Sequence, residues 1–147
     1  MKRRLLIWVI LAVYLAVLLR LTVFRNGCFS HALCSGRVVW GPFIYLIGLL
    51  QQGNLRYFLY LFVGNLVWFV PLGILLRLLG LSWKQTLMCG LGLSVLIEAT
   101  QFVLGCGVSE TEDVILNTCG TGIGCGLYVL FRRLHTSRRQ HRQSPCP

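Results

Sequence analysis

The acidic residues of this chain are few and close together in sequence. Glu98, Glu110, Glu112 and Asp113 are the only carboxylates among 147 residues, and the formal net charge is +10. Glu98 lies inside an apolar run, three residues before Gln101. A carboxylate buried among apolar groups, with no Lys or Arg nearby, can work as an acid or a base. Glu98 and Asp113 are therefore the candidate catalytic residues.

Amide side chains are predicted at a similar depth to these carboxylates. The helical rise places Glu98 about 9 Å and Asn65 about 12 Å below the outer membrane surface. Polar groups at that depth are costly unless they face one another inside a bundle. We predict a ligand-binding pocket in the outer half of the membrane, made of Asn65, Glu98, Gln101, Glu110, Asp113 and Asn117. For the amides, the alternative is adhesion between helices, at about 0.6 kcal/mol per hydrogen bond.

The composition predicts that membrane helices position these residues. The chain is 56% hydrophobic and 12% charged, with a mean hydropathy of +0.72, whereas soluble chains carry about 25% charged residues. Four apolar runs are long enough to cross a hydrocarbon core of about 30 Å. The runs are 5–24, 57–80, 85–105 and 113–131. We predict an all-α integral membrane protein with four transmembrane helices in one bundle, in a domain of residues 1–134.

The connection between the first two runs contains a shorter apolar segment. Residues 38–50 are too few to span a bilayer, so an interfacial or re-entrant segment in the first outer loop fits them better. A fifth spanning helix is the alternative. Residues 135–147 are predicted to be a basic, disordered cytoplasmic tail.

Basic residues give the expected orientation, because Lys and Arg gather in cytoplasmic loops. With both termini cytoplasmic, the inner set is Lys2, Arg3, Arg4, Arg77, Lys84, Arg132, Arg133, Arg138, Arg139 and Arg142, and the outer set is Arg25, Arg37 and Arg56. The positive charge is thus a topology signal in a multi-pass membrane protein. Nucleic acid is not expected as a partner, because the charges flank a span and no aromatic platform accompanies them.

Cysteine and glycine residues are assigned structural roles. Of the seven cysteines, Cys28 and Cys34 could pair if the outer face is oxidising, with Cys106 a further candidate. Those in the spans, Cys89, Cys119 and Cys125, are read as packing residues. No metal site or cofactor is predicted, because C-x-x-C is absent and no His lies near the acidic stretch.

Two glycine-containing stretches are expected to shape the bundle. Pro71 with Gly73 predicts a kink in the second helix. Gly120, Gly122, Gly124 and Gly126 form two overlapping G-x-x-x-G spacings, which let another helix approach closely.

Three motifs in this order resemble the VanZ-like family of small bacterial membrane proteins: "NLVWFVPLG", "IEATQ" and "EDVILNTCG". The matching positions are Asn65, Phe69, Pro71, Gly73, Glu98, Gln101, Glu110, Asp113, Asn117 and Gly120. "WGPF" at 40–43 is similar to the Pro-Phe of the family's first outer loop. Gly107 stands where many members have an Arg, so anion binding would fall to Arg56 or Arg37 or be absent.

The resemblance implies a membrane role, since the family is named for a protein associated with teicoplanin resistance. The favoured hypothesis is a pocket for a lipid-linked or amphiphilic envelope ligand, with an effect on glycopeptide susceptibility. The alternatives are an intramembrane acid-base enzyme acting on a lipid headgroup and a small proton-coupled transporter. The expected partners are membrane lipids and the amphiphilic ligand, and a homodimer stays open, since so short a transporter would require one.

Overall fold

The computed structural model describes residues 2–23, 37–39, 41, 43–105 and 108–143. In chain order the elements are α1 (Lys2–Thr22), β1 (Arg37–Val39), α2 (Ile44–Gln51), α3 (Leu55–Leu78), α4 (Trp83–Leu104), β2 (Val108–Glu110) and α5 (Thr111–Gln143). Four helices are long and apolar enough to cross a membrane, namely α1, α3, α4 and the Thr111–Ser137 part of α5. The predicted fold class, an all-α protein with four membrane helices, is confirmed.

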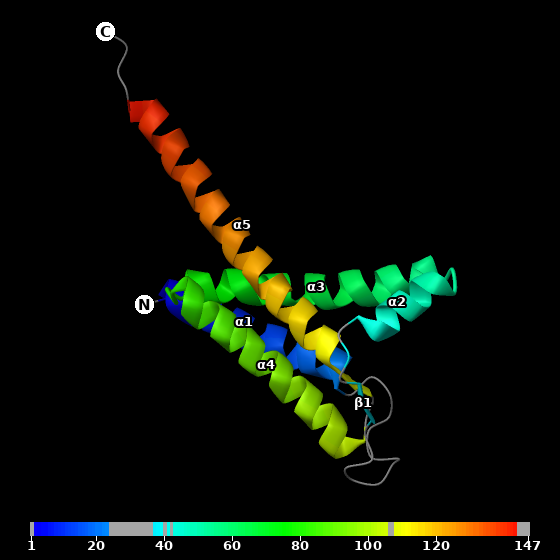
Figure 1. Cartoon of the computed structure of the whole chain (residues 1–147). Helices are drawn as coiled ribbons and strands as arrows, with labels where there is room; N and C mark the ends of the chain where they lie inside the picture. Colours follow the sequence, from blue (N-terminus) through cyan, green and yellow to red (C-terminus); the bar gives the residue numbers. More distant parts are fainter. Residues whose placement is uncertain (1, 24–36, 40, 42, 106–107, 144–147) are drawn as a thin grey trace.

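The bundle has two chemically distinct ends. One end holds α2, β1 and β2, and we call it the sheet end; the connection from α3 to α4 lies at the opposite end, close to the N-terminus, and we call it the turn end (Figure 1). A capping box between Ser82 and Gln85 begins α4 at the turn end, and Gly105 in the left-handed conformation ends it at the sheet end.

The segment between α1 and α3 forms a short helix. With eight residues, α2 is about 12 Å long, so no fifth spanning helix forms in the described residues. The structure also contains a minor feature that the sequence did not predict, a two-stranded parallel sheet that pairs Val38 with Ser109 and Val39 with Glu110. Strands of three residues are too short to show a recognisable alternation of apolar and polar residues.

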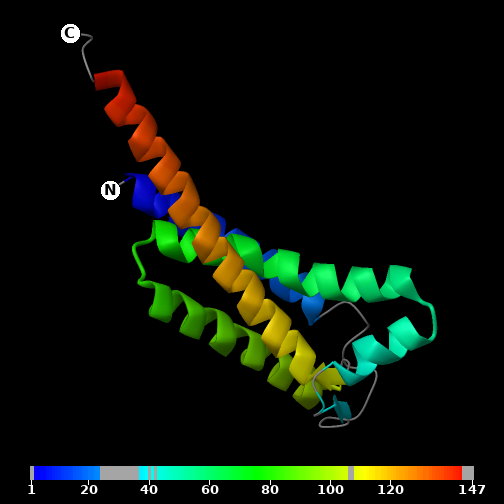
Figure 2. The ribbon, with the colours of Figure 1, turned by 45° about the horizontal axis from the view of Figure 1, so that its top comes forward.

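The closest helix packing is between α3 and α5, which cross in both views (Figures 1 and 2). A Cβ atom added to Gly120 would collide with the Leu66 carbonyl oxygen, and one added to Gly124 with the Val70 carbonyl oxygen. A Cβ atom added to Gly73 of α3 would collide with the Thr121 carbonyl oxygen of α5 and would lie close to Gly124. We call this contact of Gly73, Gly120 and Gly124 the glycine seam. One of the two predicted G-x-x-x-G spacings therefore packs helices, whereas an added Cβ at Gly126 meets nothing within 4 Å.

The α3 helix continues without interruption through Pro71, which is exposed. Phe69, on the same turn, is 1% exposed and belongs to the hydrophobic core with Leu18 of α1 and Ile97 of α4. The Tyr14 hydroxyl of α1 also donates a hydrogen bond to the Trp68 carbonyl oxygen. The first helix is thus attached to the bundle through α3.

The C-terminal segment differs from the prediction of a disordered tail. Residues 135–143 continue α5 as helix to Gln143, and this part extends away from the other helices (Figures 1 and 2). The physical reason is that no Gly follows Gly126 and the next Pro is Pro145, so no helix-terminating residue intervenes.

Candidate functional site

A cavity of about 720 Å³ lies among α1, α3, α4 and α5. Its size is typical of small-molecule sites. Five of the six predicted site residues line it, and we call these five the polar floor: Asn65, Glu98, Gln101, Asp113 and Asn117. The sequence-based expectation that these groups come together on separate helices agrees with this geometry, while their role in ligand binding stays a prediction.

The other lining residues are mostly apolar. The apolar set comprises Leu21, Leu59, Leu61, Val63, Val67, Trp68 and Ile97. Arg56 and Tyr60, both exposed, also line the cavity on α3. Apolar walls around a few convergent polar groups suit a molecule with an apolar part and a polar head.

Hydrogen bonds tie the polar floor to all four helices. Asn65 Nδ2 of α3 donates to Asp113 Oδ1 of α5. Asn117 Nδ2 of α5 donates to Ser94 Oγ of α4 at 2.8 Å, and Gln101 Nε2 of α4 donates to the Thr22 carbonyl oxygen of α1 at 3.2 Å. Each amide thus joins two helices, as interhelical adhesion would require. The same bonds fix the direction of the floor's acceptor atoms.

Glu98 connects the floor to the small sheet. Its side chain is 8% exposed, and its Oε2 accepts a 2.9 Å hydrogen bond from the Glu110 backbone N–H. The Ser109 hydroxyl donates to the Glu98 carbonyl oxygen at 2.8 Å. The strand β2 is therefore held against α4 by two hydrogen bonds around one residue, which explains why a carboxylate sits inside an apolar run.

Glu110 is the one predicted site residue that does not line the cavity. Burial raises its pKa to about 7, with the negative charges of Asp113 and Glu112 adding to the effect. Among the described residues, no group of three or more His, Cys, Asp or Glu could hold a metal ion.

Sequence reasoning left three residues out of the predicted site. Glu112 is 2% exposed, and its Oε2 has no hydrogen-bond partner in the described part of the chain. Ser94 and the Thr22 carbonyl oxygen are partners of floor amides. Ser94 could have been found, because it is a hydroxyl residue one helical turn before Glu98 in an apolar run.

Several predictions fall outside the described residues. These concern the pairing of Cys28 with Cys34 or Cys106, and the substitution at Gly107. Among the described cysteines, Cys125 is buried as a packing residue would be, whereas Cys89 and Cys119 are exposed. Of the two arginines proposed to replace the missing family Arg, Arg56 lines the cavity, and the Arg37 side chain is not described.

Comparison with known proteins agrees with this architecture. The search of curated proteins and that of solved structures give no match. A family model, described as VanZ/LLP1, matches residues 6–132. The match covers α3 and α4 in full, most of the spans in α1 and α5, and every residue of the polar floor. Given this coverage, the chain is a multi-pass membrane protein that belongs to the VanZ/LLP1 family.

Proposed function

We propose that this protein binds a lipid-linked or similarly amphiphilic molecule of the cell envelope in the cavity above the polar floor. The observation that carries the proposal is the division of the cavity into apolar walls on α1, α3 and α4 and a floor of two carboxylates and three amides. An amphiphile would place its chain against the walls and its head on the floor, since each surface then meets a group of matching polarity.

The floor favours a head group that donates hydrogen bonds. Gln101 Oε1 and Asn117 Oδ1 are buried and accept no hydrogen bond from the described residues. The Glu98 and Asp113 carboxyl groups line the same cavity and supply further acceptors. Hydroxyl, amine or amide N–H groups, such as those of a sugar or a peptide-bearing head, supply the complementary donors.

Arg56 supports a phosphate on the same ligand. Among the described residues that line this cavity, Arg56 is the only Lys or Arg. A guanidinium can hold a phosphate through two parallel hydrogen bonds. A lipid-linked head that carries phosphate near the chain and hydrogen-bond donors beyond it therefore fits the arrangement best.

The proposal includes an orientation in a bacterial cell membrane with both termini cytoplasmic. Its support is the charge of the turn end, which among the described residues includes Lys2, Arg3, Arg4, Arg77, Lys84, Arg132 and Arg133. The cavity then opens in the outer half of the bilayer, where cell-wall lipids are handled. If the protein competes with a teicoplanin-type antibiotic for such a lipid, or alters the amount of that lipid, susceptibility to the antibiotic would change.

The experiment is to fill the cavity without disturbing the fold. A Cβ at Gly64, which lines the cavity, meets no atom within 4 Å, so Gly64→Leu places a side chain where the ligand would lie. Gly126→Leu is the matched control, because Gly126 is equally open and does not line the cavity. Mass spectrometry of lipids that co-purify in native nanodiscs is the measurement. We expect a species that wild type and Gly126→Leu retain and Gly64→Leu loses; identical lipids in all three would refute the proposal.

A second function, acid-base chemistry on the head group, is favoured by one observation. Glu98 and Asp113 line the same cavity from α4 and α5, so a bound head would meet both carboxyl groups. Incubating the co-purified species with wild type and with Glu98→Gln separates the two functions. Conversion by wild type alone indicates catalysis, and no conversion by either leaves binding as the function.

A further inference from the structure

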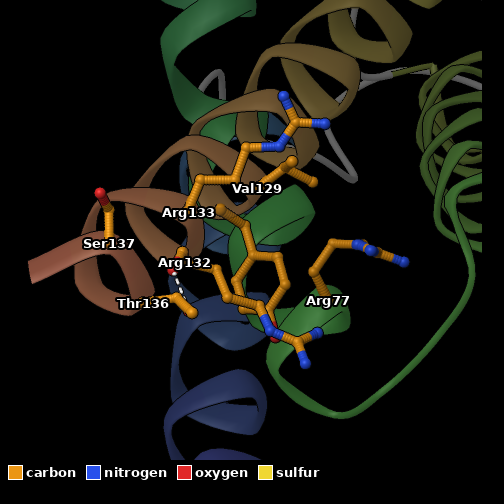
Figure 3. Close-up of a pocket in the computed structure, with 7 residues that line it drawn as sticks. Arg77, Val129, Arg132, Arg133, Thr136 and Ser137 are labelled. Carbon is orange, nitrogen blue, oxygen red and sulfur yellow. Dashed lines mark hydrogen bonds between the residues drawn. The ribbon is translucent and has the colours of Figure 1, made fainter. Parts of the chain in front are cut away.

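A second cavity, of about 450 Å³, lies at the turn end between the last turns of α3 and the part of α5 that leaves the bundle. None of its lining residues belongs to the first cavity. Three arginines line it, Arg77 of α3 with Arg132 and Arg133 of α5 (Figure 3). The hydroxyl residues Thr136 and Ser137 complete its polar lining. We call it the arginine pocket.

Arg77 is held in place by its surroundings. Its Nη1 donates a hydrogen bond to the Leu81 carbonyl oxygen, and its guanidinium carbon lies 5.4 Å from the centre of the Tyr128 ring. Both contacts restrict the side chain, which lowers the entropy lost on binding an anion. The Nε–H of Arg77 is buried and finds no acceptor in the described part of the chain, so one donor of this guanidinium is unused.

The positive charge of the pocket has no carboxylate side chain to balance it. The four Asp and Glu residues of the chain are Glu98, Glu110, Glu112 and Asp113, and all lie toward the sheet end, in the second half of α4, in β2 and in the first turn of α5. Figure 3 shows the guanidinium groups of Arg77 and Arg132 on one side of the pocket and that of Arg133 on the other. Like charges that line one pocket repel, and an anion bound between them would reduce the repulsion.

The surface beside the pocket is apolar. On α5, Leu130, Phe131 and Leu134 are 51%, 65% and 51% exposed. Arginines at the end of a span lie at the level of the lipid head groups, while the preceding turns meet the acyl chains. A ligand in this pocket would therefore have an anionic head beside apolar chains.

We propose that the arginine pocket binds the phosphate of an anionic phospholipid, with Arg77 and Arg132 as its main ligands. The acyl chains lie along the exposed apolar side chains of α5. This site is independent of the proposed ligand cavity, since it lies at the opposite end of the bundle and its lining carries the opposite charge.

The test uses the full-length protein and native mass spectrometry with defined lipids. Wild type should retain phosphatidylglycerol at least tenfold more tightly than phosphatidylcholine. The double variant Arg77→Gln/Arg132→Gln should bind phosphatidylglycerol roughly 25-fold more weakly, at about fivefold for each arginine near the membrane surface. Lys84→Gln removes one positive charge from the turn end outside the pocket; it is the control for a single arginine substitution and should stay within about twofold of wild type.

Two further variants keep the test decisive if the double variant folds poorly. Arg132 is exposed, so Arg132→Gln alone should fold and lose about fivefold in affinity, and Arg77→Lys should recover most of the binding that Arg77→Gln loses. Equal affinity of wild type and Arg132→Gln for phosphatidylglycerol would overturn the proposal. If inorganic phosphate raises the melting temperature as much as phosphatidylglycerol does, the pocket serves a soluble phosphate and the lipid assignment is wrong.

Discussion

The two ends of the bundle present opposite chemistry from the same pair of helices. At the sheet end, Asn65 of α3 binds Asp113 of α5, and hydrogen-bond acceptors dominate. At the turn end, Arg77 of α3 lies over Tyr128 of α5, and donors dominate. Between these pairs the two helices meet at the glycine seam. The comparison shows that close helix packing occupies the middle of the α3–α5 contact, and that interacting polar side chains lie at its two ends.

The two sites also differ in how their polar groups are held. Every residue of the polar floor makes a hydrogen bond that links two elements. The arginines, by contrast, face no carboxylate of their own chain. We infer that the sheet end is a preformed site, and that the turn end depends more strongly on an external anion.

The largest effect is expected from a single substitution that weakens binding at both sites. Gly124→Ala puts a Cβ against the Val70 carbonyl oxygen of α3, and overpacking of this kind costs about 1–3 kcal/mol. Both the cavity ligand and the phosphatidylglycerol site should weaken, and the melting temperature should fall. The control is Gly126→Ala, two residues along the same helix in open space. A Gly124→Ala protein as stable as Gly126→Ala would contradict the role given to the glycine seam.

A substitution with a smaller effect should weaken ligand binding at the sheet end and leave lipid binding at the turn end unchanged. Asn65→Leu removes the donor to Asp113, and the loss of one such hydrogen bond costs about 0.5–1.5 kcal/mol. The species that co-purifies in the cavity should be lost, while phosphatidylglycerol binding at the turn end should stay within about twofold of wild type. Native mass spectrometry on one preparation measures both. Parallel loss at both ends would mean that they are not independent.

Two substitutions of Glu98 distinguish a hydrogen-bonding role from a role in proton transfer at the sheet end. Glu98→Gln keeps an oxygen that can accept the Glu110 N–H, so a binding role should tolerate it. Glu98→Leu leaves that N–H without a partner, at about 1–3 kcal/mol, and should reduce both stability and ligand retention. If Glu98→Gln is as abundant as wild type but inactive in a teicoplanin susceptibility assay, the acid-base or proton-coupled function replaces simple binding.

The last effect concerns pH and should arise at the sheet end alone. Because the pKa of Glu110 is raised from 4.5 to about 7, the folded protein binds more protons than the unfolded one between these values. Stability should therefore fall as pH rises from about 4.5 to about 7 and change little above. Melting temperatures of wild type and Glu110→Gln should diverge over this window, while Arg132→Gln should follow wild type. A constant difference between wild type and Glu110→Gln at every pH would exclude this contribution.

The sequence predicted the membrane helices well, because each is a long apolar run bounded by charges or turn residues. Five of the six residues predicted for the site line one cavity, since a buried carboxylate such as Glu98 must find partners on other helices; their role in ligand binding stays a prediction. The sequence missed the pairing of β1 with β2, because three-residue strands carry no pattern. It also missed the end of α5, where a charged composition suggested disorder although no residue stops the helix before Pro145.

The arginine pocket shows a different limit of sequence reasoning. Arg77 and Arg132 are far apart in the chain, and the positive-inside pattern already accounts for each of them. Only the crossing of α3 and α5 brings them to one cavity. Charge that serves as a topology signal in sequence can therefore form a binding site in three dimensions.

The most direct test of the central claim is photo-crosslinking in native membranes. A photoreactive amino acid would replace Leu61, which lines the cavity, and in a second protein Leu130, which is exposed on α5 outside it. Mass spectrometry then identifies the adducts. A cavity that holds an envelope amphiphile predicts one lipid-linked species enriched at position 61, reduced by Gly64→Leu, against ordinary phospholipids at position 130. The same phospholipids at both positions would contradict a specific ligand site on the polar floor.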